Sequence, residues 1–255
     1  PDELVEEAQR HLAAGFRAMK VKSGFGVRQD ALDVAAVREA IGPDVLLMVD
    51  ANHAYETGLA RRLLHELDEL DVFWFEEPVS PENIDGYVEL RALGSTTLIA
   101  AGEVEYTLSG FWPWITRRAV DIRQPDVAAA GGFTAMKQII AAAGAANLLL
   151  NPHMFGTGIG LAASLHAAAI VPPCPQSRGA YEPLAELDQS RHPFRDAVVH
   201  EPLRMQGGRL TVSTGPAWAS RRPRRARPTR LLSDQMAGAR AGIPRWRGRG
   251  VGQCR

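Results

Sequence analysis

The sequence predicts an α/β protein built as a TIM-type (β/α) barrel, and three observations support this fold class. Short apolar runs recur along residues 18–183, and each ends in polar or charged residues. Marker residues at the ends of these runs lie 23 to 29 residues apart, an interval that suits one strand, one helix and their loops. Amphipathic stretches lie between the runs. Such a barrel brings the carboxyl ends of its strands to one mouth.

Seven strands are expected, one for each apolar run. The runs are AMKVKSG (18–24), VLLMVDAN (45–52), VFWFEEP (72–78), LIAAGE (98–103), AVDIRQPD (119–126), NLLLNPHM (147–154) and RGAYEP (178–183). In VFWFEEP, four successive apolar residues favour a strand buried on both faces, and Pro78 ends it because proline has no N–H for the ladder. Helices are expected between the strands because leucines or isoleucines recur there every three or four residues, as at 59–67 and 136–140.

The composition is typical of a soluble globular protein. Hydrophobic residues make up 45% of the chain and charged residues 23%, and no apolar run approaches the roughly 18–20 residues that span a bilayer. PDELVEEAQR at the start does not read as a signal peptide, and Cys174 and Cys254 form neither a disulfide framework nor a metal cluster. We therefore expect a cytoplasmic location. No GxGxxG follows the first strand and no GxxxxGK[ST] is present, so nucleotide folds are not supported.

The net charge of zero conceals two different segments. Residues 217–255 contain 11 Arg, no Lys and one acidic residue, so this tail carries +10 and the remainder −10. We expect the tail to be disordered, or to result from a frameshift near Pro216. The rival interpretation is a basic arm that binds nucleic acid. Because Trp218 and Trp246 are its only aromatic residues, nucleic-acid binding is not expected.

Asp50, Glu76 and Glu103 end three successive predicted strands. Carboxylates about 4 Å apart repel each other by about 4 kcal/mol per pair at an effective dielectric near 20, so three of them at one mouth need a cation. An all-oxygen ligand set without cysteine or clustered histidine favours Mg²⁺ over zinc. The alternative is that each acid is a solvated strand-end or helix-capping residue.

Two lysines lie in MKVKSG, on the first predicted strand. Lys20 and Lys22 share one face of that strand at a separation of about 7 Å. Their mutual repulsion is expected to lower the pKa of one lysine toward that of a usable base. A pair of lysines on a solvated edge strand is the alternative.

Asp126 and His153 end the next two strands, in QPD and NPH. On neighbouring strands a carboxylate can orient an imidazole and raise its basicity; a structural histidine is the alternative. Glu182, in YEP, ends the last predicted strand. Asn52 follows Asp50 closely and is expected to touch a substrate, whereas a structural role is favoured for its neighbour His53.

The motifs KVK, VDAN, EEP, AGE, QPD followed by GG, and NPH occur in this order. Over about residues 1–216 they resemble the enolase superfamily, specifically its mandelate racemase-like subgroup of acid-sugar enzymes. The subgroup is indicated by DIRQPD, since muconate-lactonizing and dipeptide-epimerase relatives typically place a lysine base on this strand. The resemblance implies that Asp50, Glu76 and Glu103 bind Mg²⁺.

The resemblance also implies a reaction. Lys22 would be the base, with Lys20 beside it. His153, paired with Asp126, would be the second acid or base. Glu182 would bind the substrate carboxylate, and Glu77 would be an outer partner of the metal ligand Glu76. The chain would be a Mg²⁺-dependent lyase that removes the proton alpha to a carboxylate through an enediolate and dehydrates a sugar acid, an aldonate or aldarate. A 2-hydroxyacid racemase or epimerase, or an inactive truncated remnant, are the alternatives. Its partner would be a small-molecule carboxylate, without membrane contact, and intact relatives are expected to form homo-oligomers.

The chain departs from the family at both ends. It begins at the helix expected over 2–14, so we expect the first barrel strand and an α+β capping domain to be missing, leaving seven of eight strands. Toward the other end, GGRLTVSTGP resembles a late β-hairpin of the family. The expected organisation is a barrel over 1–190, a hairpin segment over 191–216 and the Arg-rich tail over 217–255.

Overall fold

A computed structural model of the chain describes residues 2–172, 182–190, 192, 194–199 and 202–212. Within this part, six parallel strands form one sheet in the order β1-β2-β3-β4-β5-β6. The strands are β1 (Ala18–Lys22), β2 (Leu46–Asp50), β3 (Val72–Glu76), β4 (Leu98–Ala101), β5 (Ile122–Arg123) and β6 (Leu149–Leu150). The helices are α1 (Asp2–Ala13), α2 (Val27–Ile41), α3 (Thr57–Glu69), α4 (Ile84–Ala92), α5 (Thr107–Thr116), α6 (Gly132–Ala145), α7 (Gly158–Ala168) and α8 (Phe194–Ala197).

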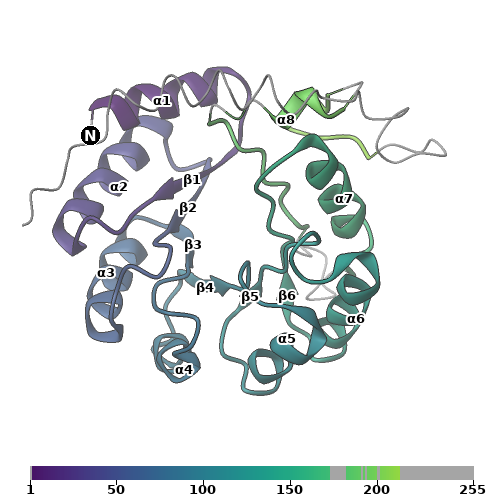
Figure 1. Ribbon diagram of the computed structural model, residues 1–255. Helices are drawn as coiled ribbons and strands as arrows, with labels where there is room; N and C mark the ends of the chain where they lie inside the picture. The colour runs from purple at the N-terminus through teal and green to yellow at the C-terminus, as the bar shows by residue number, and fades with distance from the viewer. Residues whose placement is uncertain (1, 173–181, 191, 193, 200–201, 213–255) are drawn as a thin grey trace, which may run out of the picture.

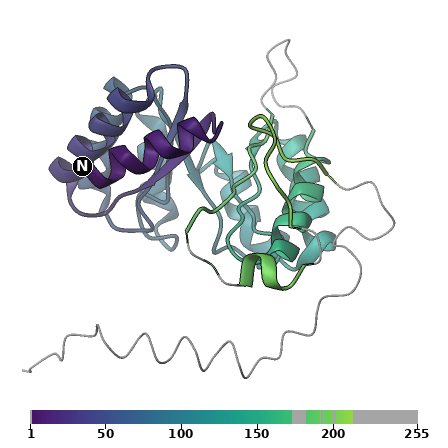
Figure 2. The ribbon, with the colours of Figure 1, turned by 90° about the horizontal axis from the view of Figure 1, so that it is seen from above.

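The sheet curves around the centre of the molecule, and the helices lie outside it. Figure 1 shows β1 to β6 along an arc, with α2 to α7 following one another around its outer side. Figure 2 shows the same arrangement from above, with α1 along one flank of the curved sheet. Consecutive parallel strands joined by outer helices are the arrangement of a (β/α) barrel, so the predicted fold class is confirmed.

Each described strand begins within one of the predicted apolar runs. As predicted, β2 ends at Asp50 and β3 at Glu76, whereas β4, β5 and β6 end before Glu103, Asp126 and His153. The seventh run, 178–183, falls mostly outside the described residues, and residues 182–183 are not in a strand. In the predicted hairpin segment, Gln206 and Arg209 pair in antiparallel fashion around two glycines. The Arg-rich tail, 217–255, lies outside the described residues. Within the described part, no helix has the length and apolar character that crossing a membrane requires.

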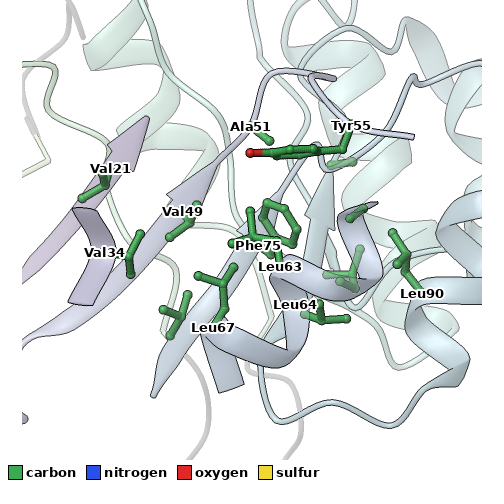
Figure 3. Packing of buried hydrophobic residues seen from close by; sticks show 14 of the residues in the cluster. Val21, Val34, Val49, Ala51, Tyr55, Leu63, Leu64, Leu67, Phe75 and Leu90 are labelled. Atoms are coloured by element: carbon green, nitrogen blue, oxygen red, sulfur yellow. The ribbon is translucent and has the colours of Figure 1, made fainter. Parts of the chain in front are cut away.

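The strands are continuous apolar runs because successive side chains point to opposite faces of the sheet and both faces are buried. Met48, Trp74, Ala100 and Ile122 form one buried cluster inside the barrel. The alternate positions pack against the helices, as Figure 3 shows for Val49 and Phe75 with Leu63, Leu64 and Leu67 of α3. Both faces of the sheet are thus covered, as the run VFWFEEP predicted.

Strand register places the polar strand ends at one level. Lys22 aligns with Asp50, and Asp50 aligns with Glu76. Beyond β5 and β6, Asp126 and His153 form an isolated parallel bridge. Since all strands run in the same direction, these residues meet at the carboxyl edge of the sheet.

A carboxylate near the end of α3 holds the segment that leads into β4. Asp68 Oδ1 accepts hydrogen bonds from the Ser95 hydroxyl at 2.5 Å, the Thr96 hydroxyl at 3.1 Å and the Thr97 amide at 2.8 Å. Partial burial acts in the opposite direction, but these donors lower the pKa of Asp68 below its ordinary value. The carboxylate form is therefore the one that stabilises this connection.

We predict that Asp68→Asn lowers the free energy of unfolding by about 1 kcal/mol at about pH 7, because a charged acceptor is replaced by a neutral one. The pKa of Asp68 is lower in the folded protein, so this stabilisation is present above the unfolded value of about 4 and is lost as the pH falls through the folded value. Urea unfolding at about pH 7 and about pH 3 measures the difference.

Glu66→Gln, at an exposed position of the same helix, is the control and should change the unfolding free energy by less than about 0.5 kcal/mol. A difference between Asp68→Asn and the parent protein that is equal at both pH values would contradict this interpretation.

Candidate active site

Three carboxylates converge at the carboxyl edge of the sheet. Asp50 ends β2, Glu76 ends β3, and Glu103 lies two residues after β4. Each offers one oxygen, and these oxygens lie within 4.8 Å of one another. Asp50 and Glu76 are fully buried, and Glu103 is partly buried. A compact set of oxygen donors fits a hard divalent cation, so this triad could hold a metal ion.

Glu76 is held by donors from both sides. Trp74 Nε1 donates to Glu76 Oε2 at 3.0 Å, and Gln124 Nε2 donates to the same oxygen at 2.8 Å. Burial is the main reason why the pKa of Glu76 is raised, and the ammonium group of Lys20 opposes it. Gln124 belongs to the QPD motif, but the sequence reasoning used only the aspartate of that motif. Gln124 lies two residues after Ile122 and therefore on the same inner face of the sheet. This alternation is the sequence signal that could have identified Gln124 as a site residue.

Lys20 is a positive charge inside the acidic cluster. Its Nζ lies 2.7 Å from Glu76 Oε1, 3.3 Å from Glu186 Oε1 and 3.7 Å from Asp50 Oδ2. Burial alone would lower its pKa, but the three carboxylates raise the pKa of Lys20 well above its ordinary value. Lys20 therefore stays protonated at neutral pH and is not a proton acceptor.

Lys22 faces the same cluster but is open to solvent, with 61% of its side chain exposed. Its Nζ donates to Asp50 Oδ2 at 2.5 Å and to Asn52 Oδ1 at 2.8 Å. The structure thus brings both predicted lysines and Asn52 to the carboxylates. Each of the two lysines contacts at least one carboxylate, and this contact offsets the repulsion between Lys20 and Lys22. The expected lowering of the Lys22 pKa by Lys20 stays a prediction.

His153 lies between two carboxylates on the other side of the triad. Its Nδ1 lies 2.9 Å from Asp126 Oδ2, and its Nε2 lies 3.0 Å from Glu103 Oε2. Burial acts to lower its pKa, but Asp126, Glu103 and Glu186 raise the pKa of His153 to about 10. The imidazole is therefore protonated at neutral pH. The structure brings the predicted Asp126–His153 pair together.

Glu77 and His53 form a second carboxylate–imidazole pair at the mouth. His53 Nε2 lies 2.5 Å from Glu77 Oε2, and the His53 amide donates to the Glu77 carbonyl at 2.8 Å. Burial, together with the nearby carboxylates of Glu103 and Asp50, raises the pKa of Glu77 to about 8. This contact agrees with the structural role favoured for His53, whereas the role of Glu77 as an outer partner of the metal ligand stays a prediction.

The segment after α7 contributes a different glutamate from the predicted one. Glu182 is exposed, and the residue of this segment that reaches the cluster is Glu186, with Oε1 3.3 Å from Lys20 Nζ and Oε2 accepting from the Met154 amide at 3.4 Å. Spacing misled the prediction, because Glu182 follows His153 at the regular interval and Glu186 does not. Residues 182–189 have no regular secondary structure, so strand periodicity does not apply to them.

A cavity of about 480 Å³ opens beside these groups. Lys20, Lys22, His153 and Glu186 line its polar part, and Phe155 belongs to its apolar lining. At the mouth, the carboxylates of the triad, Glu77, Asp126 and Glu186 outnumber the amines of Lys20 and Lys22 and the imidazoles of His53 and His153. An anionic ligand would be repelled from this mouth unless a bound cation offset the excess negative charge.

Three carboxylates at the carboxyl edge of a parallel sheet, with two lysines on one side and an Asp–His pair on the other, define a class: a (β/α)-barrel domain whose mouth could hold a metal ion. More specifically, the chain belongs to the enolase C-terminal domain-like family, which matches residues 3–218. Within the enolase superfamily it groups with the mandelate racemase-like proteins, as its motifs predicted.

Several of the similar proteins are named for sugar acids or their lactones. D-galactarolactone cycloisomerase of Agrobacterium fabrum is 42% identical over 215 residues, which are 84% of this chain and 56% of that enzyme. The crystal structure of 3,6-anhydro-D-galactonate cycloisomerase from Zobellia galactanivorans is 41% identical, with a TM-score of 0.79 over 86% of this chain and 59% of that one.

L-talarate dehydratase from a Polaromonas species, solved in complex with Mg and L-glucarate, is 29% identical, with a TM-score of 0.74 over 85% of this chain and 56% of that one. This chain spans about half the length of the curated relatives that it matches. The relatives therefore include both cycloisomerases and dehydratases.

Asp126→Asn is predicted to lower the pKa of His153 by about one to two units, because a hydrogen bond to a charged group contributes about 1.5–3 kcal/mol and one pKa unit corresponds to about 1.4 kcal/mol. An NMR titration of the imidazole C–H resonances measures the change. His65, exposed on α3, is the internal reference and should titrate identically in both proteins. If His153 also titrated identically, Asp126 would not be the group that stabilises the imidazolium.

Proposed function

We propose that this chain forms the Mg²⁺-dependent barrel of a lyase that acts on sugar acids. In the proposed reaction, the proton alpha to the substrate carboxylate is removed and an oxygen on the beta carbon leaves. The observation that supports the proposal most directly is the placement of the His153 imidazole across the carboxylate triad from the Lys22 amine. A base and an acid on opposite sides of one substrate are what an elimination requires.

Asp50, Glu76 and Glu103 would hold the metal ion. When bound, Mg²⁺ would offset the negative charge that develops on the substrate carboxylate as the alpha proton leaves. Lys20 adds a fixed positive charge beside the triad, 2.7 Å from Glu76. Both charges favour an anionic substrate at a mouth that otherwise carries an excess of carboxylates.

Lys22 is proposed as the base. It must be neutral before it can accept the alpha proton, and 61% of its side chain is open to solvent. The hydrogen bonds to Asp50 and Asn52 hold its Nζ at the edge of the cavity. The base therefore approaches the substrate from the side of β1.

His153 is proposed as the acid. When the alpha C–H bond breaks, its electron pair is first delocalised into the substrate carboxylate as an enediolate, which can take up a proton from solvent again. When the beta C–O bond then breaks, this electron pair forms the carbon–carbon double bond. The departing oxygen takes a proton from the imidazolium, and His153 later regains a proton from solvent. The raised pKa of His153, about 10, keeps this proton available at neutral pH. With a hydroxyl as the leaving group, the reaction is dehydration of an aldonate or aldarate.

Cycloisomerisation is the second candidate function. Two proteins of 41–42% identity are named as cycloisomerases. The same removal of the alpha proton serves such a reaction if the departing oxygen belongs to a ring of the substrate, because it then stays attached and the product has an unchanged mass. Dehydration and cycloisomerisation are thus distinguished by the leaving group alone.

We predict that Glu103→Gln weakens Mg²⁺ binding by about 100-fold or more, since loss of an outer contact alone typically costs about 10- to 100-fold. Isothermal titration calorimetry of the full chain with MgCl₂ measures the affinity. Glu105→Gln is the matched control, because Glu105 lies two residues further along and is not part of the triad. Its affinity should stay within about twofold of the parent value. Equal Mg²⁺ affinities of Glu103→Gln and the parent protein would contradict the proposed ligand set.

The reaction itself is tested with a panel of sugar acids and their lactones in D₂O with Mg²⁺. We expect deuterium at the alpha carbon of the recovered substrate by NMR, and a product that has lost one water in a dehydration or, apart from the deuterium taken up, kept its mass in a cycloisomerisation. Lys22→Met should abolish both exchange and product. His153→Asn should keep the exchange and lower product formation by about 100-fold or more. A panel in which no substrate exchanges its alpha proton would contradict the proposal.

A further inference from the structure

Two buried side chains outside the triad join the loops at the barrel mouth. Asp30, on α2, is 1% exposed, and Tyr55, in the loop after β2, is 7% exposed. The Asp30 carboxylate accepts hydrogen bonds from the Gly24 amide at 2.7 Å, from the Phe25 amide at 3.2 Å and from the Tyr55 hydroxyl. A buried charge is costly unless it has such partners, so the three donors explain why an aspartate is tolerated at this position.

Tyr55 is itself fixed to the loop after β3. Its amide donates to the Pro78 carbonyl at 3.2 Å. Figure 3 shows its ring next to Phe75, with the hydroxyl pointing toward the side on which Val21 lies. Burial and the bond to Asp30 raise the pKa of Tyr55 well above its ordinary value, so the phenol stays a donor at neutral pH. Tyr55 thus links the loops after β2 and β3 to the loop after β1.

The loops after β1 and β2 also touch directly. Gly24 has a φ of +111°, and a β-carbon at this position would lie 2.8 Å from the β-carbon of Ala54. Only glycine allows both this conformation and this approach. Gly24 lies two residues after Lys22, and Ala54 lies two residues after Asn52, which accepts a hydrogen bond from Lys22 at 2.8 Å. The contact therefore holds the loop that directly follows the proposed base against the loop that carries its partner Asn52.

We propose that Asp30 and Tyr55 are positioning residues for Lys22. Their hydrogen bond fixes the loop after β1 against the loop after β2, and this keeps the Lys22 amine against Asp50 and Asn52. An effect of Asp30 and Tyr55 on catalysis rests on the proposed function of Lys22 as the base. Their effect on the position of the Lys22 amine does not rest on that function. Proton transfer needs the base within hydrogen-bond reach, and a misplacement of about 1 Å can cost about 100-fold in rate.

Tyr55→Phe tests this bond because it removes the hydroxyl and keeps the ring. Hydrogen–deuterium exchange of the full chain should become about tenfold faster at the Gly24 and Phe25 amides, the factor expected for the loss of about one hydrogen bond. Acetylation of Lys22 by acetic anhydride without substrate, followed by mass spectrometry, should also become faster, because the amine spends less time bound to Asp50. Asp30→Asn should change both quantities in the same direction, because the amide is a weaker acceptor than the carboxylate.

Tyr87→Phe is the matched control. Tyr87 is also a buried tyrosine, and its hydroxyl donates to the Val79 carbonyl at 2.7 Å. Val79 forms a backbone bridge with Tyr55, so this variant perturbs the same loops but keeps the bond between Tyr55 and Asp30. It should leave the Gly24 and Phe25 exchange and the Lys22 acetylation unchanged. If Tyr55→Phe left them unchanged too, or if Tyr87→Phe altered them equally, the positioning role would be wrong.

A third readout separates this role from the proposed function. With Mg²⁺ and a substrate that the parent protein deprotonates, Tyr55→Phe should slow alpha-proton exchange about tenfold and leave Mg²⁺ affinity unchanged. Faster acetylation with unchanged alpha-proton exchange would show that Lys22 is held by the pair but is not the base. If the parent protein exchanged no alpha proton while acetylation changed as expected, the positioning role would stand and the proposed function would fail.

Discussion

The mouth of this barrel is governed by repulsion between carboxylates that parallel strands deliver to one edge. Register aligns Asp50 with Glu76, and adjacent strands lie about 4.8 Å apart, so the backbone itself keeps these acids close. Their coexistence requires positive charge nearby. Lys20 supplies part of it from β1, and His153 supplies part of it from beyond β6. A divalent cation on the same oxygens would complete the compensation, which is why the acidic cluster and the proposed chemistry belong together.

The fold was predictable because its strands are buried on both faces and so give continuous apolar runs at a regular interval. What the runs did not define was where each strand ends. β5 and β6 are far shorter than the predicted strands, and Pro125 and Pro152 follow them closely. A proline has no N–H to continue the ladder, so the regular pairing stops before the polar residues that the pattern had included. Only the isolated bridge between Asp126 and His153 restores it.

The site was predictable where strand geometry alone places a residue, as for the triad, the lysines and the Asp126–His153 pair. It was not predictable where placement depends on backbone conformations that residue type does not signal. His53 and Glu77 meet because both have positive φ, +67° and +42°, which non-glycine residues rarely adopt. Glu186 comes from a segment without regular structure. The regular spacing therefore does not locate Glu186, and the expected contact of Glu182 with a substrate carboxylate stays a prediction.

This division between strands and loops has a consequence for the reaction. Removal of the alpha proton is common to dehydration and cycloisomerisation, so the groups that perform it cannot decide which oxygen leaves. That choice must depend on contacts to the remainder of the substrate. In the described part of the chain, the cavity beside His153 is lined by residues of α1 and β1, by the segment 184–190 and by Phe155, 62% exposed in the loop after β6. In the proposed reaction, the groups at the strand ends would supply the shared proton chemistry. The irregular segments, which can vary without disturbing the barrel, are where selectivity between leaving groups would arise.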